Sequence, residues 1–129
     1  MIRGLNHITL AVRDLDRALA FYRDTLQLRV EKIWDQGAYL SAGSLWLCLS
    51  QDSSAQKRTD YTHFAFDVSQ QAFAATADRI VKSGAEIWKA NLSEGASLYF
   101  CDPDGHQLEL HVGTLASRLS AMKRELETC

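Results

Sequence analysis

Leu5-Asn6-His7-Ile8-Thr9-Leu10-Ala11-Val12 and Tyr61-Thr62-His63-Phe64-Ala65-Phe66-Asp67-Val68 are two look-alike stretches of this chain of 129 residues. Their histidines are 63 − 7 = 56 residues apart. Both stretches are predicted to form β-strands. Because a duplicated unit places equivalent residues equivalently, the repeat predicts two similar halves, each with one histidine at the same place.

The first half continues with a predicted helix and three strands. Asp14 can cap the helix, which is expected to end near Gln27, and its apolar residues recur at spacings of three or four, the period of one buried face. These residues are Leu15, Leu19, Tyr22 and Leu26. The strands are expected at residues 28–34, 38–41 and 45–50, separated by turns at Gln36-Gly37 and Gly43-Ser44. The first unit is therefore βαβββ over about residues 4–51.

The second half repeats this order over about residues 60–112. Ser69 is the predicted cap and Gly84 the predicted end of a helix with apolar residues at Phe73, Ala77, Ile80 and Val81. Strands are expected at residues 85–89, 97–101 and 107–112, and Asp102-Pro103-Asp104-Gly105 supplies a tight turn between the last two.

A third amphipathic stretch predicts a terminal helix over about residues 114–126. Its apolar face would carry Leu115, Leu119, Met122 and Leu126. The sequence therefore predicts a single α+β domain over residues 1–129, made of two tandem βαβββ units and a C-terminal helix.

Composition narrows the function classes. The chain is 47% hydrophobic and 23% charged, which is ordinary for one domain with a core. A formal net charge of −2 and the lack of a long Lys/Arg run exclude nucleic acid or an anionic membrane as the main partner. The N-terminal residues lack the pattern of a secretory signal, so we expect a cytoplasmic protein. Cys48, Cys101 and Cys129 form no CxxC pair and are expected to be free thiols rather than disulfides or zinc ligands.

A carboxylate in the last strand completes a candidate metal site. Glu109 alternates with Leu108 and Leu110, so it faces away from the surface that these leucines bury. An ionised carboxylate that faces a cavity needs a cation, because an unpaired buried charge is costly. The set of His7, His63 and Glu109 leaves coordination positions open and suits divalent Mn, Fe, Zn or Ni without selecting one. The alternatives are structural, hydrogen-bonded histidines and a Glu109 that faces water.

Two further histidines compete for the role of ligand. His106 lies beside the Asp-Pro-Asp-Gly turn and is interpreted as a turn residue. His111 has the same strand parity as Glu109, so only geometry can exclude it. Both rank below His7 and His63, because neither belongs to the repeated pair.

Six blocks of sequence, taken in order, carry a family resemblance. They are Gly4–Val12, Trp34–Leu40, Ser44–Ser50, Asp60–His63, Ser93–Ser97 and Asp102–His106. With the paired βαβββ units and the two histidines and glutamate, they resemble the vicinal oxygen chelate superfamily, which includes glyoxalases, extradiol dioxygenases and bleomycin-binding proteins. Within it, the chain resembles the fosfomycin-resistance glutathione transferases (FosA type) from residue 4 to about residue 119.

The resemblance implies a vicinal oxygen chelate fold and two cations. His7, His63 and Glu109 match the family's Mn²⁺ ligands, and the halves would be exchanged between subunits, so that each site is completed across a domain-swapped homodimer. K⁺ would bind a loop whose hard oxygen ligands suit an alkali cation. The matching loop residues are Asn91, Ser93, Glu94, Gly95 and Ser97.

The resemblance also implies substrate-binding residues. Those matched to fosfomycin, several of them to its phosphonate, are Thr9, Trp46, Cys48, Tyr61, Lys89, Ser93, Ser97, Tyr99 and Arg118. A lysine, an arginine and hydroxyls suit a tetrahedral oxyanion. From the residues alone, Lys89 and Arg118 would be ordinary exposed charges. Residues matched to the glutathione region are Trp34, Gln36, Tyr39 and Ser50.

The implied reaction is the opening of the fosfomycin epoxide by glutathione. A metal would stabilise the negative charge that grows on the epoxide oxygen, and a thiolate would attack the carbon next to phosphorus. Thr9 and Tyr39 are the implied catalytic residues, with Tyr39 easing deprotonation of the thiol. Hydrolase relatives carry a water-activating glutamate at the place of Gly37, and bacillithiol-using relatives commonly carry cysteine at the place of Thr9. Both residues here favour glutathione.

Two features depart from the family's pattern. Leu92 stands where close relatives often have a basic residue near the glutathione region, and the chain ends at Cys129 without the longer tail of many relatives. Other functions stay open: a fosfomycin-modifying relative that uses water or another thiol, a metalloenzyme of the glyoxalase or dioxygenase kind, and a drug-sequestering protein that needs no metal ligands.

Overall fold

The first strand of each half begins one residue after its histidine. In the computed structural model, which describes residues 1–128 and the side chains of residues 1–125, β1 spans Ile8–Val12 and β5 spans Phe64–Asp67. The prediction that both histidines lie within these strands was therefore wrong by one residue. The reason is that strand pairing begins only at the next residue: Ile8 pairs with Leu47, and Phe64 pairs with Leu108.

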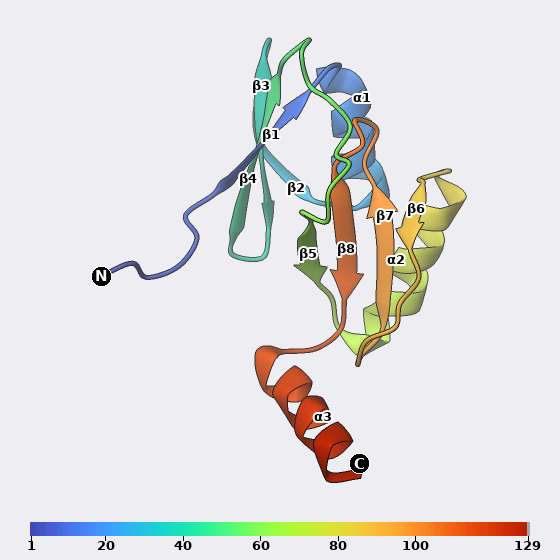
Figure 1. Ribbon diagram of the computed structural model, residues 1–129. Coiled ribbons are helices and arrows are strands. Elements are labelled where there is room, and N and C mark those ends of the chain that lie inside the picture. The colour runs from blue at the N-terminus through green and yellow to red at the C-terminus, as the bar shows by residue number, and fades with distance from the viewer. Residues whose placement is uncertain (129) are drawn as a thin grey trace. The chain divides into compact units, whose positions relative to one another are not determined.

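The first half forms a four-stranded sheet. Its remaining elements are α1 (Leu15–Leu19), the π-helix η1 (Ala20–Thr25), β2 (Arg29–Trp34), β3 (Gly37–Ala42) and β4 (Leu45–Gln51). The strand order is β1-β4-β3-β2, with β1 parallel to β4 and the other neighbours antiparallel (Figure 1). This is the βαβββ order that the sequence predicted.

Local sequence explains the helix of this half. The Asp14 carboxylate accepts a hydrogen bond from the Arg17 amide (3.1 Å) and caps α1 as predicted. Gln27, just after η1, has a positive φ of 59°, which ends the helical path. The helical segment contacts β3 and β4 and buries apolar side chains against them. The buried residues of α1 and η1 are Leu15, Ala18, Leu19, Phe21 and Tyr22.

The turn of residues 102–106 groups with this first unit. By contacts, the chain divides into unit 1 (residues 1–59 and 102–106) and unit 2 (residues 60–101 and 107–129). The Asp104 carboxylate accepts hydrogen bonds from the Arg13 amide (2.9 Å) and the Arg17 guanidinium (3.2 Å). His106 Nε2 donates to the carbonyl of Ala11 (2.7 Å), so His106 is a turn residue as interpreted.

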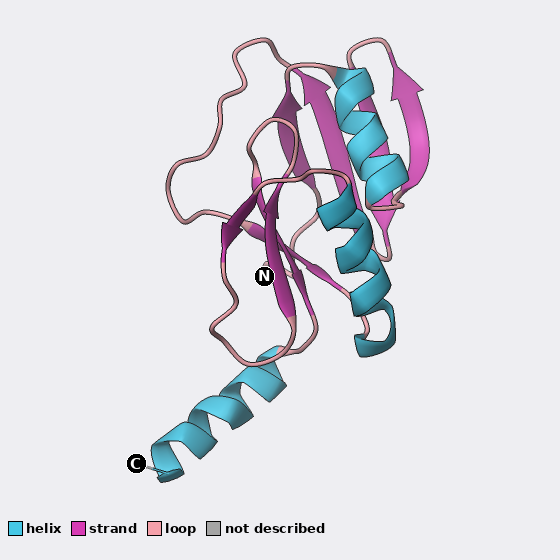
Figure 2. Cartoon of the chain, turned by 90° about the vertical axis from the view of Figure 1, so that its right-hand side faces the viewer, coloured by secondary structure: helices cyan, strands magenta, loops and turns pink. Residues whose placement is uncertain are grey.

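The second half repeats the arrangement. After β5 come α2 (Gln70–Lys82), β6 (Ile87–Lys89), β7 (Ser97–Cys101), β8 (Gln107–His111) and α3 (Leu115–Thr128). The sheet order is β5-β8-β7-β6, with β5 parallel to β8, and α2 covers one face of the sheet (Figure 2). The Ser69 hydroxyl caps α2 by accepting from the Ala72 amide (3.2 Å), and Gly84 follows its end with φ of 84°.

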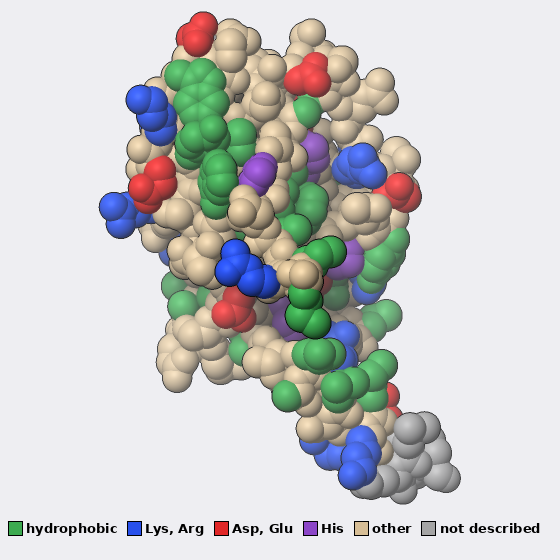
Figure 3. All heavy atoms as spheres, turned by 90° about the vertical axis from the view of Figure 1, so that its left-hand side faces the viewer, with side chains coloured by type: hydrophobic (Ala, Val, Ile, Leu, Met, Phe, Trp, Pro, Cys, Tyr) green, Lys and Arg blue, Asp and Glu red, His purple; other side chains and the backbone are tan. Residues whose placement is uncertain are grey.

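The apolar residues of the helices in this half are less buried than the periodicity predicts. Ile80 is fully buried, but Val81 is 54% exposed, because α2 buries only a narrow stripe. Leu115, Leu119 and Met122 of α3 are 75%, 55% and 52% exposed, and Figure 3 shows hydrophobic side chains (green) along this helix. The Leu126 side chain lies outside the described residues. No helix in the described part of the chain has the length and apolar character needed to cross a membrane.

Candidate metal and anion site

His63 and Glu109 face each other in the second unit. Glu109 is only 6% exposed, and its Oε1 lies 3.2 Å from Nε2 of His63. Two ligands that bind one divalent metal at about 2.1 Å, with an angle between the tetrahedral and the octahedral value, lie about 3.0–3.4 Å apart. The observed separation therefore fits two adjacent ligands of one metal ion.

The other nitrogen of His63 sets the tautomer of the ring. Nδ1 lies 2.8 Å from the backbone carbonyl of Tyr61, and a carbonyl only accepts, so Nδ1 is the donor. A neutral ring then presents a lone pair from Nε2, and the carboxylate of Glu109 presents another. Two acceptors held this close need a cation or a proton between them, and metal-ligating histidines commonly donate their second nitrogen to a carbonyl in this way.

His7 of the first unit has an equivalent arrangement. Its Nδ1 lies 2.8 Å from the side-chain oxygen of Asn6, which leaves Nε2 available, and its ring packs 4.4 Å from that of Trp46. Among the described residues, no three His, Cys, Asp or Glu side chains gather into a group that could hold a metal ion. The second unit thus supplies a pair, and His7 stands with the first unit.

One face of the first sheet collects several of the residues matched to substrate and most of those matched to the thiol. The register places Thr9, Cys48, Tyr39 and Lys32 in one row across β1, β4, β3 and β2. Leu47 and Leu49, which flank Cys48, are buried on the opposite face, so the row faces outward. The predicted residues with outward parity on this unit are Thr9, Trp34, Tyr39, Trp46, Cys48 and Ser50. Gln36 lies in the turn between β2 and β3, where its carbonyl accepts from the Gln51 amide.

The register also explains why the two units differ in ligands. In the first sheet, the residue two positions after His7 pairs with Cys48. In the second sheet, the residue two positions after His63 pairs with Glu109. Cys48 is therefore the topological equivalent of Glu109. A soft thiol replaces a hard carboxylate, so one unit offers one candidate ligand and the other offers two.

Lys89 lies beside this pair of ligands in the second sheet. Lys89, Tyr99 and Glu109 share one row across β6, β7 and β8. The Lys89 ammonium donates to the Tyr61 hydroxyl (2.5 Å) and lies 4.6 Å from the centre of the Tyr99 ring. The hydrogen bond with Tyr61 raises the pKa of Lys89, which keeps it cationic. A lasting positive charge between two phenols suits an anionic oxygen ligand.

The loop of residues 91–97 is folded by its own hydrogen bonds. The Asn91 side chain accepts from the amide and hydroxyl of Ser93 (3.1 Å each) and donates to the carbonyl of Gly95 (2.9 Å). Arg118 joins the loop through Glu94 Oε1 (3.4 Å) and the Ser93 hydroxyl (3.4 Å). The oxygen-rich loop and Arg118 are thus in contact with each other.

Comparison with known proteins identifies the family. The sequence profile of the Glyoxalase/Bleomycin resistance protein/Dioxygenase superfamily matches residues 4–110. The chain belongs to this superfamily. It is 49% identical, over 97% of its length and 92% of the relative's, to the glutathione transferase FosA of Serratia marcescens. It is 36% identical to the metallothiol transferase FosB of Shouchella clausii, over 93% of this chain and 87% of that protein.

Solved structures of the superfamily agree with the fold. The chain resembles the fosfomycin resistance protein FosX of Listeria monocytogenes, solved in complex with Mn(II) and sulfate ion, with a TM-score of 0.83. The two sequences are 35% identical, and the match covers 95% of this chain and 99% of that chain. The predicted vicinal oxygen chelate fold, with its C-terminal helix, is confirmed.

Sequence reasoning undervalued two residues of this superfamily member. His111 ranked below the repeated histidines, although its parity with Glu109 was recognised, and the structure places it beside Glu109 (Nδ1 to Oε2, 3.4 Å). Trp88 was not considered, yet its ring centre lies 5.3 Å from that of His63 and its indole donates to the carbonyl of Leu108 (3.0 Å). Cys48 and Cys101 are free thiols as expected, and Cys129 lies outside the described residues.

Proposed function

We propose that this protein is a metal-dependent glutathione transferase that opens the epoxide of fosfomycin and thereby confers resistance to that antibiotic. The glutathione transferase FosA, 49% identical over nearly the whole chain, supports the choice of reaction. The structural observation that carries the proposal is the pair of acceptors, His63 Nε2 and Glu109 Oε1, held 3.2 Å apart, with Glu109 in the same sheet as the cationic Lys89.

His7, His63 and Glu109 would hold the metal, with His7 provided by a second copy of the chain in a domain-swapped homodimer. Mn²⁺ is the metal we favour, because the related FosX structure contains Mn(II). A divalent ion bound there supplies Lewis acidity for the epoxide oxygen. Two nitrogen ligands and one carboxylate leave open positions for a substrate oxygen.

The phosphonate is assigned to the cationic and hydroxyl side chains of the second unit. Lys89 would bind it as a charged donor, and Arg118 would turn toward it from Glu94, with which it forms an ion pair at 3.4 Å. Hydroxyls would complete the binding site by donating to the oxygens of the phosphonate. In the second unit these belong to Tyr61, Ser93 and Tyr99, and Thr9 would add one from the same copy of the chain as His7. The loop of residues 91–97 would hold K⁺ next to this anion.

The thiol is assigned to the open face of the first sheet. The Tyr39 ring packs against the rings of Trp34 and Trp46, with ring centres 4.7 Å and 5.3 Å away. We infer that the Tyr39 hydroxyl eases removal of the thiol proton. The thiolate sulfur then forms a bond to the epoxide carbon next to phosphorus, the carbon–oxygen bond breaks, and the oxygen ends as an alcohol after taking up a proton.

Gly37 argues against water as the nucleophile. A Cβ at this position would lie 2.6 Å from the Trp34 ring and 2.7 Å from the backbone oxygen of Leu49. The glutamate that hydrolase relatives are expected to carry here therefore has no room in this chain. Without that carboxylate, the structure offers no base at this place to activate water.

The test is product formation by metal-stripped protein. Fosfomycin and glutathione are incubated with the protein, with and without Mn²⁺ and K⁺, and adduct is followed by phosphorus NMR. We expect adduct only with Mn²⁺, more of it with K⁺, and none from the Glu109→Ala variant. A diol product would indicate water as the nucleophile, and Mn²⁺ binding without any product would overturn the proposal. If no metal binds, the sequestering function takes its place.

A further inference from the structure

His111 and Ser97 form a short chain of hydrogen bonds that ends on Glu109. The Ser97 hydroxyl lies 2.7 Å from Glu109 Oε2 and 2.6 Å from His111 Nδ1. Side chains of β7 and β8 make both contacts, because Ser97 and His111 are paired in the sheet register. We propose that His111 is a positioning residue, which fixes through Ser97 the orientation of the Glu109 carboxylate for metal binding. The inference rests on the proposed metal-dependent function.

The direction of these hydrogen bonds follows from the count of protons. A serine hydroxyl has one proton, and an ionised carboxylate only accepts. If Ser97 donates to Glu109, its oxygen must accept from His111, so Nδ1 must carry a proton. The reverse arrangement, in which Ser97 donates to His111, would leave two oxygens at 2.7 Å with no proton between them unless Glu109 is neutral. A metal ligand is ionised, so the first arrangement is the one compatible with metal binding.

The two oxygens of Glu109 then have separate tasks. Oε1 faces Nε2 of His63, while Oε2 is held by Ser97 and lies 3.4 Å from His111 Nδ1. A carboxylate tied at one oxygen cannot rotate freely about its last bond, so the other oxygen stays aimed at the metal position. Outer hydrogen-bond partners of this kind typically raise metal affinity about 10–100-fold.

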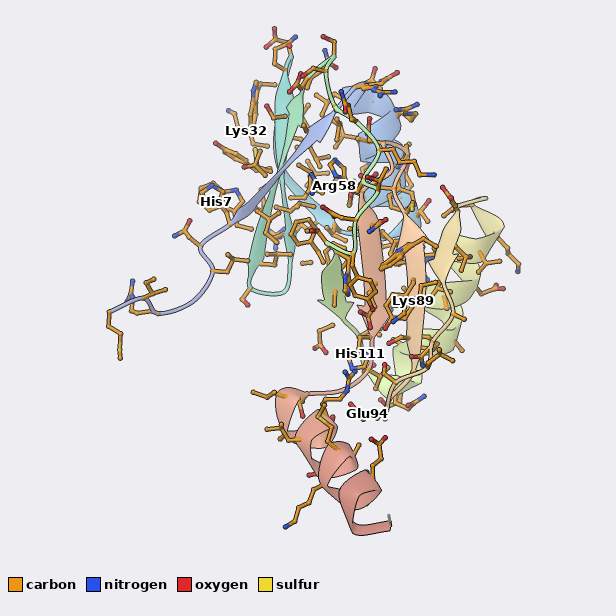
Figure 4. All side chains as sticks on the ribbon, viewed as in Figure 1. His7, Lys32, Arg58, Lys89, Glu94 and His111 are labelled. Atoms are coloured by element: carbon orange, nitrogen blue, oxygen red, sulfur yellow. The ribbon has the colours of Figure 1, made fainter. Side chains whose placement is uncertain are left out.

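The surroundings of His111 hold its ring in place. A Cβ on Gly113 would lie 2.8 Å from Nε2, and a Cβ on Gly95 would lie 3.1 Å from Cε1, so both glycines leave room for the imidazole. Glu94 Oε1 lies 4.0 Å from Nε2, and Figure 4 shows Glu94 and His111 next to each other where β8 ends. The loop of residues 91–97 therefore packs against the same histidine that steadies Glu109.

Geometry separates this role from that of a metal ligand. Nδ1 is occupied by the Ser97 hydroxyl, and it lies on the Oε2 side of Glu109, whereas His63 lies on the Oε1 side. His111 acts through Ser97, and removal of either residue should therefore have the same consequence.

The first test reads the protonation of the ring in the wild-type protein. Long-range ¹H–¹⁵N correlation spectra of metal-free and Zn²⁺-loaded protein distinguish the two imidazole nitrogens. We expect Nδ1 of His111 to carry a proton in the Zn²⁺-loaded protein. An unprotonated Nδ1 there would overturn the proposal, because it would mean that Ser97 donates to His111. This measurement needs no variant, so a failure of a variant to fold does not affect it.

The second test measures Mn²⁺ affinity without substrate, by electron paramagnetic resonance of free Mn²⁺. His111→Phe and Ser97→Ala should each weaken binding about 10–100-fold. The double variant should be no weaker than the poorer single variant, since the two residues act as one unit. His111→Asn, whose amide can donate near the position of Nδ1, should recover much of the loss.

Ser117→Ala is the matched control. The Ser117 hydroxyl contacts Glu94 Oε1 (3.2 Å) near His111 but makes no bond to Ser97 or Glu109, so Mn²⁺ affinity should not change. Unchanged affinity in His111→Phe, or additive losses in the double variant, would overturn the inference. Lack of Mn²⁺ binding by the wild type would instead overturn the proposed function, while the spectra of the Zn²⁺-loaded protein would still test the hydrogen-bond chain.

Discussion

Burial and one hydrogen bond shift the pKa of the Asp102 carboxyl in opposite directions. Burial raises the pKa of Asp102, and the hydrogen bond from the Tyr22 hydroxyl (2.7 Å) lowers it again. Burial, followed by the charge of Asp102, raises the pKa of Tyr22 well above its ordinary value, so the phenol stays a donor. Because the pKa of Asp102 is higher in the folded state, this carboxyl stabilises the fold less as pH rises through that pKa.

Tyr22→Phe tests this contact. Loss of a hydrogen bond to an ionised buried group should lower the free energy of unfolding by about 1.5–3 kcal/mol at neutral pH. The hydroxyl lowers the pKa of Asp102, so its contribution is present above that pKa and declines as pH falls through it. Urea unfolding at pH 7 and at lower pH measures both effects. Tyr39→Phe, which removes a hydroxyl from a partly exposed side chain, should change stability little, and an equal loss in both variants would contradict the argument.

The proposed role of Lys89 in substrate binding leads to a separate prediction. Lys89→Met removes a charged donor, worth about 1.5–3 kcal/mol, and should raise the KM for fosfomycin about 10–100-fold. Mn²⁺ affinity should be unchanged, because the lysine is not a candidate ligand. Steady-state kinetics with phosphorus NMR detection measures the first and metal titration the second. Lys82→Met, which removes an exposed lysine paired with Asp78 on α2, serves as the control and should leave KM as it is.

Sequence identified His63 and Glu109 through repetition and strand parity, and the structure brings them together. The same reasoning could not place His111, because it has the same parity as Glu109 and differs from His63 only in which oxygen of the Glu109 carboxylate it adjoins. That distinction depends on side-chain rotamers and on the pairing of Ser97 with His111 across β7 and β8. Neither is encoded in spacing along the chain.

At the scale of elements, the sequence predicted those helix ends that are set by neighbouring residues. The caps at Asp14 and Ser69 and the helix end at Gly84 follow from side chains and backbone next to them. The change from α1 to the π-helix η1 left no such signal. The exposure of Val81 and of the apolar face of α3 could not be predicted either. Burial depends on what packs against a helix, whereas periodicity describes only the helix itself.

A side chain at Gly95 should destabilise the loop of residues 91–97 in two ways, through backbone strain at a positive φ and through a steric clash. Gly95 and Gly84 both have a positive φ, 79° and 84°. A Cβ at Gly95 would clash with the backbone oxygen of Val112, whereas a Cβ at Gly84 would meet nothing within 4 Å. Gly84→Ala should therefore lower the free energy of unfolding by about 1–2 kcal/mol through backbone strain. Gly95→Ala should lower it further, as measured by urea unfolding. Equal losses would show that the loop adapts to the added methyl group.

At the scale of the whole molecule, the candidate ligands are unequally shared. His7 belongs to the first unit, while His63 and Glu109 belong to the second. Large apolar side chains are also exposed, among them Leu5 at 74% and Leu115 at 75%. Both observations are consistent with the proposed homodimer, in which a second copy completes each site and covers apolar surface.

Mixing two inactive variants tests whether sites are shared between copies. In the proposed dimer, each site takes His7 from one chain and His63 with Glu109 from the other, so His7→Ala and His63→Ala homodimers lack every complete ligand set. A mixed dimer has one site with both changes and one site with neither. Random mixing after unfolding and refolding should therefore restore about a quarter of wild-type activity, because half of the dimers are mixed and each has one intact site of two. Mixing without unfolding is the control and should restore activity only as fast as subunits exchange. If each site took all its ligands from one chain, every site in the mixture would carry one change, and refolding would restore nothing.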